Sequence, residues 1–380
     1  MEYILEENKC CGCQACANIC PKNAITMQEN EKGFLYPSID QDKCINCGAC
    51  KQACPVLNKK EEVEKDIATY ACYNKNLQER LNSSSGGMFI LLAKEIIRKG
   101  GVVFGAAFDE NFNVKHTYAD NEKDLIKFMG SKYTQSDIGN TYKEAKKFLE
   151  QDRVVLFSGT PCQIEGLKAY LKKDYDKLYT QDIICHGVPS PKVWRKYLDY
   201  QKELNNEDIK SVSFRNKDHG WSLFRMKISF DTKAYSENHN EDLYMKSFLK
   251  NICLRDSCYE CSFKKKYRIS DITLADFWGI DKIYPNMNDD KGISLILLNS
   301  AKGKELFGEI KKNIEYREVE LDIAAKYNSA LTESAKHCVN EKEFLENVDN
   351  LDFDKLVNKY VPKTPLEKRI KNIIKKIIKI

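Results

Sequence analysis

The sequence lacks several features that define common protein classes. It has no uninterrupted apolar run of 18 residues, the length that a helix needs to cross a bilayer. Its first residues, 1–7, lack the basic-then-apolar layout of a secretory signal peptide. It contains no G-x4-G-K-[ST] phosphate loop, and no GxGxxG follows a predicted strand. We therefore expect a cytoplasmic protein that is neither a P-loop NTPase nor a standard dinucleotide-binding enzyme.

An excess of charge is also missing from most of the chain. The 380 residues have a formal net charge of +5, but residues 363–380 hold seven Lys and Arg against one Glu. The rest of the chain therefore sums to −1 and offers no basic footprint for nucleic acid, so we expect no nucleic-acid partner. Hydrophobic residues make up 42% of the chain, which is enough for packed cores.

Cysteine, by contrast, is abundant, with 16 residues. In a long chain of a reducing compartment, cysteines bind metal or take part in catalysis more often than they form disulfides. The spacing Cys-x2-Cys-x2-Cys-x3-Cys-Pro begins at Cys10 and again at Cys44. In ferredoxins with two 4Fe-4S clusters, the fourth Cys of each run binds the cluster of the other run. We therefore assign one cluster to Cys10, Cys13, Cys16 and Cys54, and the second to Cys44, Cys47, Cys50 and Cys20.

Other features of this region agree with a ferredoxin module. Gly12 and Gly48 occupy matching places in the two loops, where reversal of the chain favours glycine. Residues 24–27 and 34–37 flank a polar turn and predict a short hairpin. Cys11 is out of register, and we interpret it as a spare buried thiol. A pair of zinc knuckles is the alternative, but zinc sites use other spacings and rarely the Cys-Pro ending.

The pattern changes after this module. A charged stretch is typical of a solvated linker, and alternating strands and helices follow it. We expect an α+β ferredoxin-like two-cluster module followed by a larger α/β domain with a mixed sheet. The predicted boundaries are 1–58 for the module, 59–66 for the linker, 67–300 for the reductase domain, 301–362 for a helical C-terminal extension and 363–380 for a basic amphipathic tail.

A Ser- and Gly-rich segment, 83–87, precedes a predicted helix over 88–97. Such an entry leaves backbone N–H groups free to bind a phosphate or another anion, although a plain helix cap is the alternative.

Two cysteines follow predicted strands of the larger domain. Strands over 154–157 and 178–184 enclose a helix, so they run parallel and end at the same edge of the sheet. Cys162 and Cys185 follow these strands, at the edge where open α/β sheets bind ligands.

A CxxC pair, Cys258 and Cys261, brings the number of cysteines available for a third metal site to four. A third cluster and a structural zinc both fit this set, because one CxxC spacing does not separate them. Cys253 is a lesser candidate, and the pattern gives no role to Cys72 or Cys338.

Several motifs together resemble the coenzyme F-420 hydrogenase/dehydrogenase beta-subunit family, in particular bacterial members with an N-terminal ferredoxin module. They lie at 84–87, 130–133, 158–163, 182–191 and 258–279. The resemblance implies FAD and iron–sulfur clusters. It implies a third cluster near the flavin on Cys162, Cys185, Cys258 and Cys261. It also implies a flavin or substrate pocket lined by Ser85, Gly86, Gly87, Ser131, Lys132 and Tyr133.

We therefore expect an iron–sulfur flavoprotein oxidoreductase that passes electrons between ferredoxin-type clusters, a flavin and a small organic substrate. Its partner would be an electron donor or acceptor protein such as ferredoxin. Lys132 or His186 could donate to a flavin or substrate oxygen, and His186 is more simply explained as a structural donor. The alternatives are an electron-transfer subunit without its own substrate, and a non-catalytic binding protein stabilised by metal.

The tail predicts an amphipathic helix. Ile370, Ile373, Ile374, Ile377 and Ile378 share one helical face, and basic residues lie off it. Such a helix can lie on an anionic membrane surface or pack on the protein or a partner, so peripheral membrane attachment is an open expectation.

Overall fold

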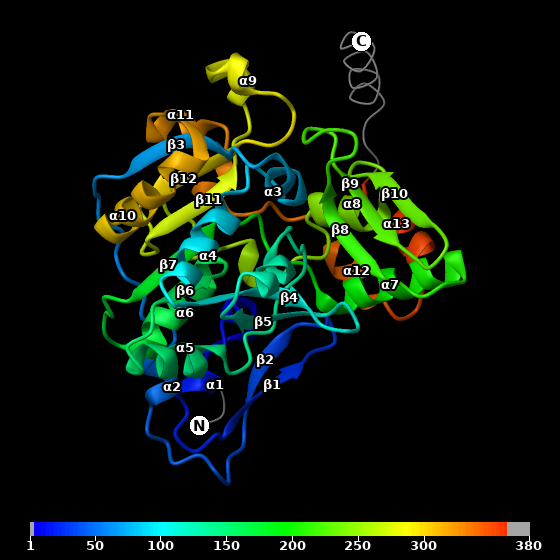
Figure 1. The fold of residues 1–380 in the computed structure, drawn as a ribbon. Coiled ribbons are helices and arrows are strands. Elements are labelled where there is room, and N and C mark those ends of the chain that lie inside the picture. Colours follow the sequence, from blue (N-terminus) through cyan, green and yellow to red (C-terminus); the bar gives the residue numbers. More distant parts are fainter. Residues whose placement is uncertain (1–3, 363–380) are drawn as a thin grey trace.

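A mixed eight-stranded sheet forms the centre of the structure, a computed structural model that describes residues 4–362 (Figure 1). Four neighbouring strands at 102–108, 155–158, 178–183 and 272–276 run parallel, and the others are antiparallel to their neighbours. In spatial order the strands are β13 (Ile314–Glu318), β3 (Ala68–Asn74), β12 (Ser294–Leu298), β11 (Ile272–Asp276), β7 (Leu178–Ile183), β6 (Val155–Ser158), β4 (Val102–Phe108) and β5 (Val114–Ala119).

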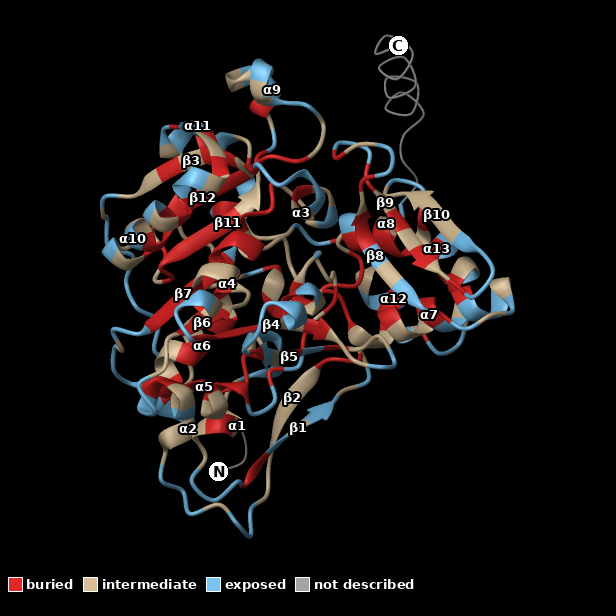
Figure 2. Cartoon of the chain, viewed as in Figure 1, coloured by how far each residue is buried: buried red, intermediate tan, exposed pale blue. Residues whose placement is uncertain are grey.

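Helices cover both faces of this sheet, which explains its near-continuous apolar strands. On one face, α4 (Met88–Arg98) and α10 (Ala301–Ile310) pack on the strands through buried Ile, Leu and Phe. On the other face lie α5 (Thr141–Glu150) and α6 (Pro161–Leu171). Figure 2 shows the inner strands β6, β7, β11 and β12 as largely buried. The expected helix over 88–97 and the parallel pairing of the strands that precede Cys162 and Cys185 are confirmed.

A smaller lobe lies beside the main sheet (Figure 1). Its antiparallel sheet and four helices enclose an aromatic core around Trp194, Tyr197 and Tyr244. The elements are α7 (Pro191–Asn205), β8 (Ser211–Asn216), β9 (Arg225–Ser229), β10 (Ala234–Asn238), α8 (Leu243–Leu249), α12 (Glu341–Glu346) and α13 (Phe353–Tyr360). The start of α7 at Pro191, capped by the Ser190 hydroxyl, is as expected from the Ser-Pro pair.

Residues 301–362, predicted as a helical C-terminal extension, contain several helices and one strand and join both lobes. β13 completes the edge of the main sheet by pairing with β3, and α10 packs against α4. α13 packs against α7 and α8, so the end of the described chain belongs to the smaller lobe. The amino-acid composition could not predict this arrangement. A segment that packs on two cores formed by earlier parts of the chain does not differ in composition from its neighbours. The short helices α3 (Leu77–Asn82), α9 (Ile280–Ile283) and α11 (Leu321–Lys326) complete the larger domain.

The amino-terminal module docks on both lobes. It contains α1 (Ala15–Ile19), α2 (Ala49–Gln52) and the predicted hairpin, formed by β1 (Ile25–Glu29) and β2 (Leu35–Ile39). α1 packs against α5 and α6 of the larger domain. Arg195 of α7 forms an ion pair with Glu29 at 2.5 Å, which ties the hairpin to the smaller lobe.

The charged linker is attached to the protein rather than merely solvated. The Lys265 ammonium donates to the Lys60 carbonyl at 3.0 Å, and the Tyr267 backbone N–H donates to the Glu62 carboxylate at 2.6 Å. Both partners follow the CxxC pair, so the linker borders that loop. The predicted tail, 363–380, lies outside the described residues. Within residues 4–362, no helix combines the length and the apolar character needed to span a membrane.

Candidate functional site

The two runs of ferredoxin cysteines lie close together, as an exchange of one ligand between the runs requires. The electrostatic neighbours of Cys16 are Cys10, Cys54 and Cys50, and those of Cys50 include Cys47 and Cys20. We call the two expected ligand sets the first ferredoxin set (Cys10, Cys13, Cys16, Cys54) and the second ferredoxin set (Cys44, Cys47, Cys50, Cys20).

The two sets have different surroundings. Cys13 is buried against α6, where a Cβ at Gly166 would lie 3.0 Å from the Cys13 sulfur. Cys47 is exposed, and the neighbouring Ile45 is 57% exposed. The first set therefore faces the interior of the protein, and the second lies at the outer surface.

Cys11, which we interpreted as a spare buried thiol, has thiol neighbours in two domains. Its thiol lies near those of Cys13 and Cys162, and it lines the central cavity. Cys11 thus lies between the first ferredoxin set and a cysteine of the larger domain. Sequence spacing did not reveal this contact because Cys162 approaches from a different domain.

Four cysteines from three segments of the larger domain lie near one another, and one of them, Cys162, lies near Cys11. Cys162 is in the first turn of α6, and Cys185 directly follows the end of β7. The CxxC pair joins them, since Cys258 has Cys185, Cys261 and Cys162 as electrostatic neighbours. We call this group the large-domain cysteines.

These thiols are held in an environment that disfavours a free thiolate. Burial raises the pKa of Cys185 to about 12 and also raises the pKa values of Cys258 and Cys261. The pKa of Cys162 is raised by its hydrogen bond with Cys11 and then by burial. Metal binding would therefore release protons from this group. The start of α6 favours the anion at Cys162, because a helix N-terminus carries partial positive charge.

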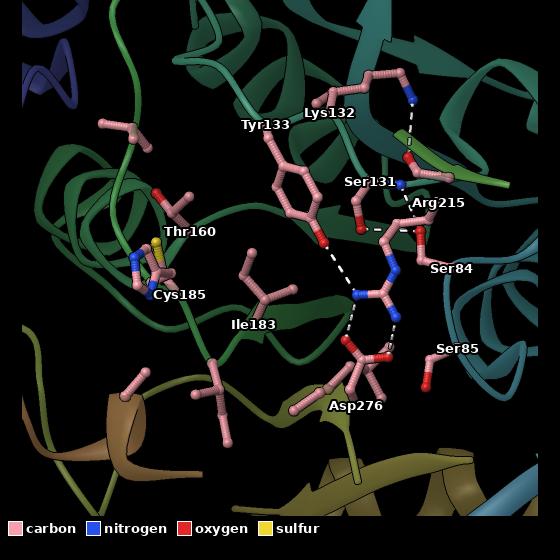
Figure 3. Close-up of a pocket in the computed structure, with 18 of the residues that line it drawn as sticks. Ser84, Ser85, Ser131, Lys132, Tyr133, Thr160, Ile183, Cys185, Arg215 and Asp276 are labelled. Carbon is pink, nitrogen blue, oxygen red and sulfur yellow. Dashed lines mark hydrogen bonds and ion pairs between the residues drawn. The ribbon is translucent and has the colours of Figure 1, made fainter. Parts of the chain in front are cut away.

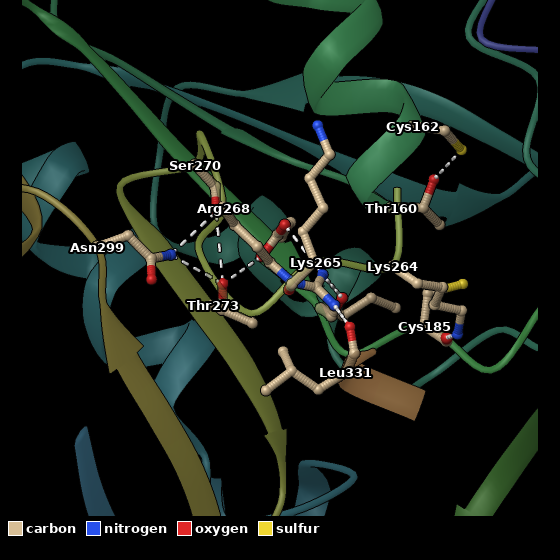
Figure 4. A network of polar contacts seen from close by, with 12 residues as sticks. Thr160, Cys162, Cys185, Lys264, Lys265, Arg268, Ser270, Thr273, Asn299 and Leu331 are labelled. Carbon is tan, nitrogen blue, oxygen red and sulfur yellow. Dashed lines mark hydrogen bonds and ion pairs between the residues drawn. The ribbon is translucent and has the colours of Figure 1, made fainter. Parts of the chain in front are cut away.

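A buried ion pair fixes the loop after the CxxC pair (Figure 4). Arg268 Nη1 donates to Asp182 Oδ2 at 3.2 Å, and both side chains are 3% exposed. Arg268 also donates to the Ile183 carbonyl at 2.9 Å, and the Thr273 hydroxyl donates to Asp182 Oδ1 at 2.6 Å. Because Asp182 and Ile183 end the strand before Cys185, this network ties the CxxC loop to Cys185.

A cavity of about 700 Å³ opens between the main sheet and the smaller lobe. Its size lies within the usual range of small-molecule and cofactor sites, about 300–1,000 Å³. Figure 3 shows Thr160 and Cys185 on one side of it and Ser84 and Ser85 on the other. Cys162 and Cys185 therefore border the same space as the Ser- and Gly-rich segment.

The Ser- and Gly-rich segment is built as the sequence suggested, with α4 starting directly after Gly87. The Ser84 hydroxyl accepts hydrogen bonds from the Ser131 backbone N–H at 2.6 Å and from the Ser131 hydroxyl at 2.9 Å. Ser85 lines the cavity, but Gly86 does not. A Cβ at Gly86 would lie 2.5 Å from the Cys72 carbonyl oxygen, so this glycine serves close packing on β3. Gly87 is needed for its φ of +81°.

Lys217 holds this segment from behind. Its ammonium donates to the backbone carbonyls of Arg80, Ser85 and Lys291 at 2.7 to 2.8 Å. Burial lowers the pKa of Lys217 to about 7. Sequence reasoning missed Lys217, because nothing near it in the sequence marks a ligand site.

Arg215 and Asp276 form a second buried ion pair at the cavity wall (Figure 3). The two guanidinium nitrogens of Arg215 donate to the two carboxylate oxygens of Asp276 at 2.8 and 3.0 Å. Arg215 also donates to the Tyr133 hydroxyl at 3.1 Å. The pair thus fixes the Tyr133 ring, which stacks on Phe248 with centroids 4.8 Å apart. Asp276 lies in a motif that carried the family resemblance, whereas Arg215 gave no signal.

Lys132 and His186 both line the cavity. The Lys132 ammonium donates to the carbonyls of Met129 and Gly130 at 3.3 and 3.2 Å, and burial lowers its pKa to about 8. Within residues 4–362, no carboxylate forms an ion pair with it. His186 Nε2 donates to Asn251 Oδ1 at 2.6 Å, which fixes the imidazole ring. Lys132 is therefore the more available cation, and His186 has a structural partner.

The residues of the cavity fit a ligand that is both aromatic and anionic. Serine hydroxyls, the N-terminus of α4 and the unpaired charge of Lys132 suit a phosphate. Tyr133 and Trp278 suit a flat ring, and Trp278 already stacks on Trp221 at 4.9 Å.

Two known protein families match successive parts of the chain. Residues 9–58 match the 4Fe-4S dicluster domain, and residues 152–322 match the C terminus of the coenzyme F420 hydrogenase/dehydrogenase beta subunit. These matches define an iron–sulfur protein of the electron-transfer, oxidoreductase type. These matches confirm that the chain resembles the coenzyme F420 hydrogenase/dehydrogenase beta-subunit family, as its motifs suggested.

Two relatives and one solved structure illustrate the likeness. The chain is 24% identical over 335 residues to the coenzyme F420-dependent sulfite reductase of Methanocaldococcus jannaschii, covering 84% of this chain and 49% of that protein. It is 22% identical over 189 residues to a subunit of the F(420)H(2) dehydrogenase of Methanosarcina mazei, covering 46% of this chain and 52% of that protein. The chain thus spans about half the length of the curated relatives it matches. A chain of the F420-reducing [NiFe] hydrogenase complex from Methanosarcina barkeri matches with a TM-score of 0.49 and 14% identity, covering 76% of this chain and 92% of that one.

Proposed function

We propose that the protein is an iron–sulfur flavoprotein oxidoreductase. In this proposal, electrons pass between a redox protein at the second ferredoxin set and a small organic substrate in the cavity. The first ferredoxin set, a third 4Fe-4S cluster on the large-domain cysteines and a flavin connect these two ends. The expected partner is a small electron carrier such as a ferredoxin.

One observation carries this proposal: cysteine sites follow one another from the surface to the cavity. Cys47 is exposed at the outer end, and Cys13 of the first set is buried against α6. Cys11 contacts both Cys13 and Cys162, and Cys185 borders the cavity. A series of this kind suits stepwise transfer of single electrons, whereas a structural role would not require that it reach a cavity.

A third cluster is favoured over a zinc ion by the spacing of the large-domain cysteines. A zinc ion binds its four ligands at about 2.0–2.3 Å, so the ligand atoms must converge on one point. No group of three or more His, Cys, Asp or Glu side chains in residues 4–362 could hold a single metal ion. A cluster needs wider spacing because each thiolate binds a different iron. The eight cysteines of the region that matches the dicluster domain likewise form no such single-ion group.

A flavin is favoured by the shape and charge of the cavity. When bound, a flavin exchanges electron pairs with organic substrates and single electrons with clusters. The chain's own residues would position it: Ser84 and Ser131 bind the phosphate end, Lys132 balances its charge, and Tyr133 borders the ring. The name of the sulfite reductase relative makes a deazaflavin of the F420 type the alternative ligand for the same residues.

The proposal is tested by the cofactor content of protein purified without oxygen. FAD, FMN and F420 are released from the protein, separated and quantified. The reductase proposal expects about one flavin per chain after reconstitution with FAD, and reduced occupancy in Lys132→Met. The matched control is Lys123→Met, which removes an exposed lysine from the segment before the cavity wall. Absence of any flavin-type ligand from the reconstituted wild-type protein would reject the proposal.

An electron-transfer subunit without its own substrate is the second candidate. It is favoured by the Methanosarcina mazei relative, which is itself named as a subunit of a dehydrogenase. A flavin-free protein that still contains reducible clusters would support it.

A further inference from the structure

Arg255 is buried at the junction of the ferredoxin module and the larger domain. Its exposed fraction is 0%. Nε donates to the Cys10 carbonyl at 2.7 Å, Nη1 to Gln135 Oε1 at 2.9 Å and Nη2 to the Leu35 carbonyl at 3.1 Å. The guanidinium also lies 4.0 Å from the centroid of the Tyr36 ring. All these partners are neutral.

Arg255 differs in this respect from the other buried arginines. The pairs are Arg80 with Asp289, Arg215 with Asp276, and Arg268 with Asp182. For Arg255, no carboxylate in residues 4–362 lies within ion-pair distance. The adjacent Asp256 is occupied by Lys32 at 2.8 Å. A buried charge without a counterion is costly, so a group of opposite charge is expected nearby.

The first ferredoxin set supplies such a group. Gly12 lies in its loop, and a Cβ at that position would be 3.0 Å from Arg255 Cζ. The four thiolates of a 4Fe-4S cluster outweigh the positive charge of its core, so the liganded cluster is anionic. The matching glycine of the second loop, Gly48, has no atom within 4 Å of the same position. The two loops therefore share a sequence pattern but only the first packs against a buried cation.

We propose that Arg255 is the counterion of the cluster on the first ferredoxin set and raises its reduction potential. Reduction adds one negative charge to the cluster, and a nearby buried positive charge stabilises the reduced form more than the oxidised form. The hydrogen bond to the Cys10 carbonyl fixes the guanidinium beside the loop. This inference involves no flavin, so it can fail or succeed independently of the proposed flavin chemistry.

The test is a redox titration of the full chain, purified without oxygen and followed by electron paramagnetic resonance. Arg255→Gln removes the charge and is expected to lower the potential of the cluster on the first ferredoxin set and leave that of the cluster on the second set unchanged. Arg255→Lys keeps the charge and is expected to give a smaller shift. The signals are assigned with Cys47→Ser, which alters the second ferredoxin set. The matched control is Lys51→Gln, an exposed cation beside Cys50 that solvent screens.

A second variant, Gln135→Glu, tests the same proposal if Arg255→Gln does not fold. Gln135→Glu has the same shape and places a carboxylate 2.9 Å from the guanidinium, so it provides Arg255 with a protein counterion. It is expected to lower the potential of the same cluster. Unchanged potentials in both variants would overturn the proposal. Equal shifts in the potentials of the two ferredoxin clusters would contradict the proposal, as would a shift in Arg255→Lys as large as in Arg255→Gln. Either result would mean that Arg255 has only a structural role.

Discussion

Replacing Arg268 with Met should destabilise the protein and loosen the large-domain cysteines. Arg268 and Asp182 are each 3% exposed, so Arg268→Met leaves a buried carboxylate without its partner. Breaking a buried pair in this way costs about 3–5 kcal/mol. The loss also frees the CxxC loop from the end of β7, which Arg268 holds through the Ile183 carbonyl. We therefore expect lower stability together with a loss of iron from the large-domain cysteines.

The loss of stability in Arg268→Met should depend on pH. Burial already raises the pKa of Asp182, and Arg268 opposes that shift. Without Arg268 the pKa of Asp182 in the folded state rises further above its unfolded value. The group then binds its proton more tightly in the folded state, so stability is lost as the pH rises through the folded pKa. The deficit of Arg268→Met should therefore shrink toward low pH.

Urea unfolding and iron analysis under anaerobic conditions measure both effects. Asp182→Asn in the Arg268→Met background removes the orphaned charge and should restore part of the stability. The matched control is Arg317→Met, an exposed arginine on β13, with an expected change within about 0.5 kcal/mol. Wild-type stability and iron content in Arg268→Met would refute the role assigned to this pair.

Three further predictions concern the cavity, the ferredoxin loops and the tail. The affinity for an anionic flavin should fall as the pH rises through about 8, because Lys132 loses its proton there. Flavin binding to Lys132→Met should not show this fall, and pH-independent binding by the wild type would contradict the prediction. Gly12→Ala and Gly48→Ala both place alanine at a positive φ, but only the Cβ of Gly12→Ala would lie 2.6 Å from Gln135 Nε2. The unfolding free energy should therefore fall by about 1–3 kcal/mol more in Gly12→Ala than in Gly48→Ala. The full chain should sediment with anionic liposomes in a salt-dependent way, whereas a chain ending at Lys363 should not; equal sedimentation would reject the membrane surface as a partner.

The sequence predicted what local patterns determine. The repeated cysteine spacing indicated the dicluster module, and the strand–helix–strand pattern placed Cys162 and Cys185 at one sheet edge. The contacts between segments far apart in the sequence could not be predicted from it. Cys11 meets Cys162 only because α1 packs on α6, and Arg255 meets Cys10 across 245 residues of chain. Neither pairing leaves a trace in composition or periodicity.

The roles of Gly86 and Gly87 also could not be predicted from the sequence. The resemblance placed Gly86 and Gly87 in a ligand pocket, but both have packing or backbone reasons that suffice without a ligand. A bulky substitution at Gly87 would strain the backbone at φ +81° whether or not a flavin binds. Lys132 is a better probe, because its side chain lines the cavity and no carboxylate within residues 4–362 forms an ion pair with it.

Iron and acid-labile sulfide per chain test the central claim most directly. Three 4Fe-4S clusters predict about 12 iron and about 12 sulfide per chain in anaerobic protein. Changing Cys258 and Cys261 to Ala should lower both to about 8 and leave the spectra of the two ferredoxin clusters intact. About 8 of each in the wild-type protein, with one zinc per chain, would contradict the account and make the large-domain cysteines a structural zinc site.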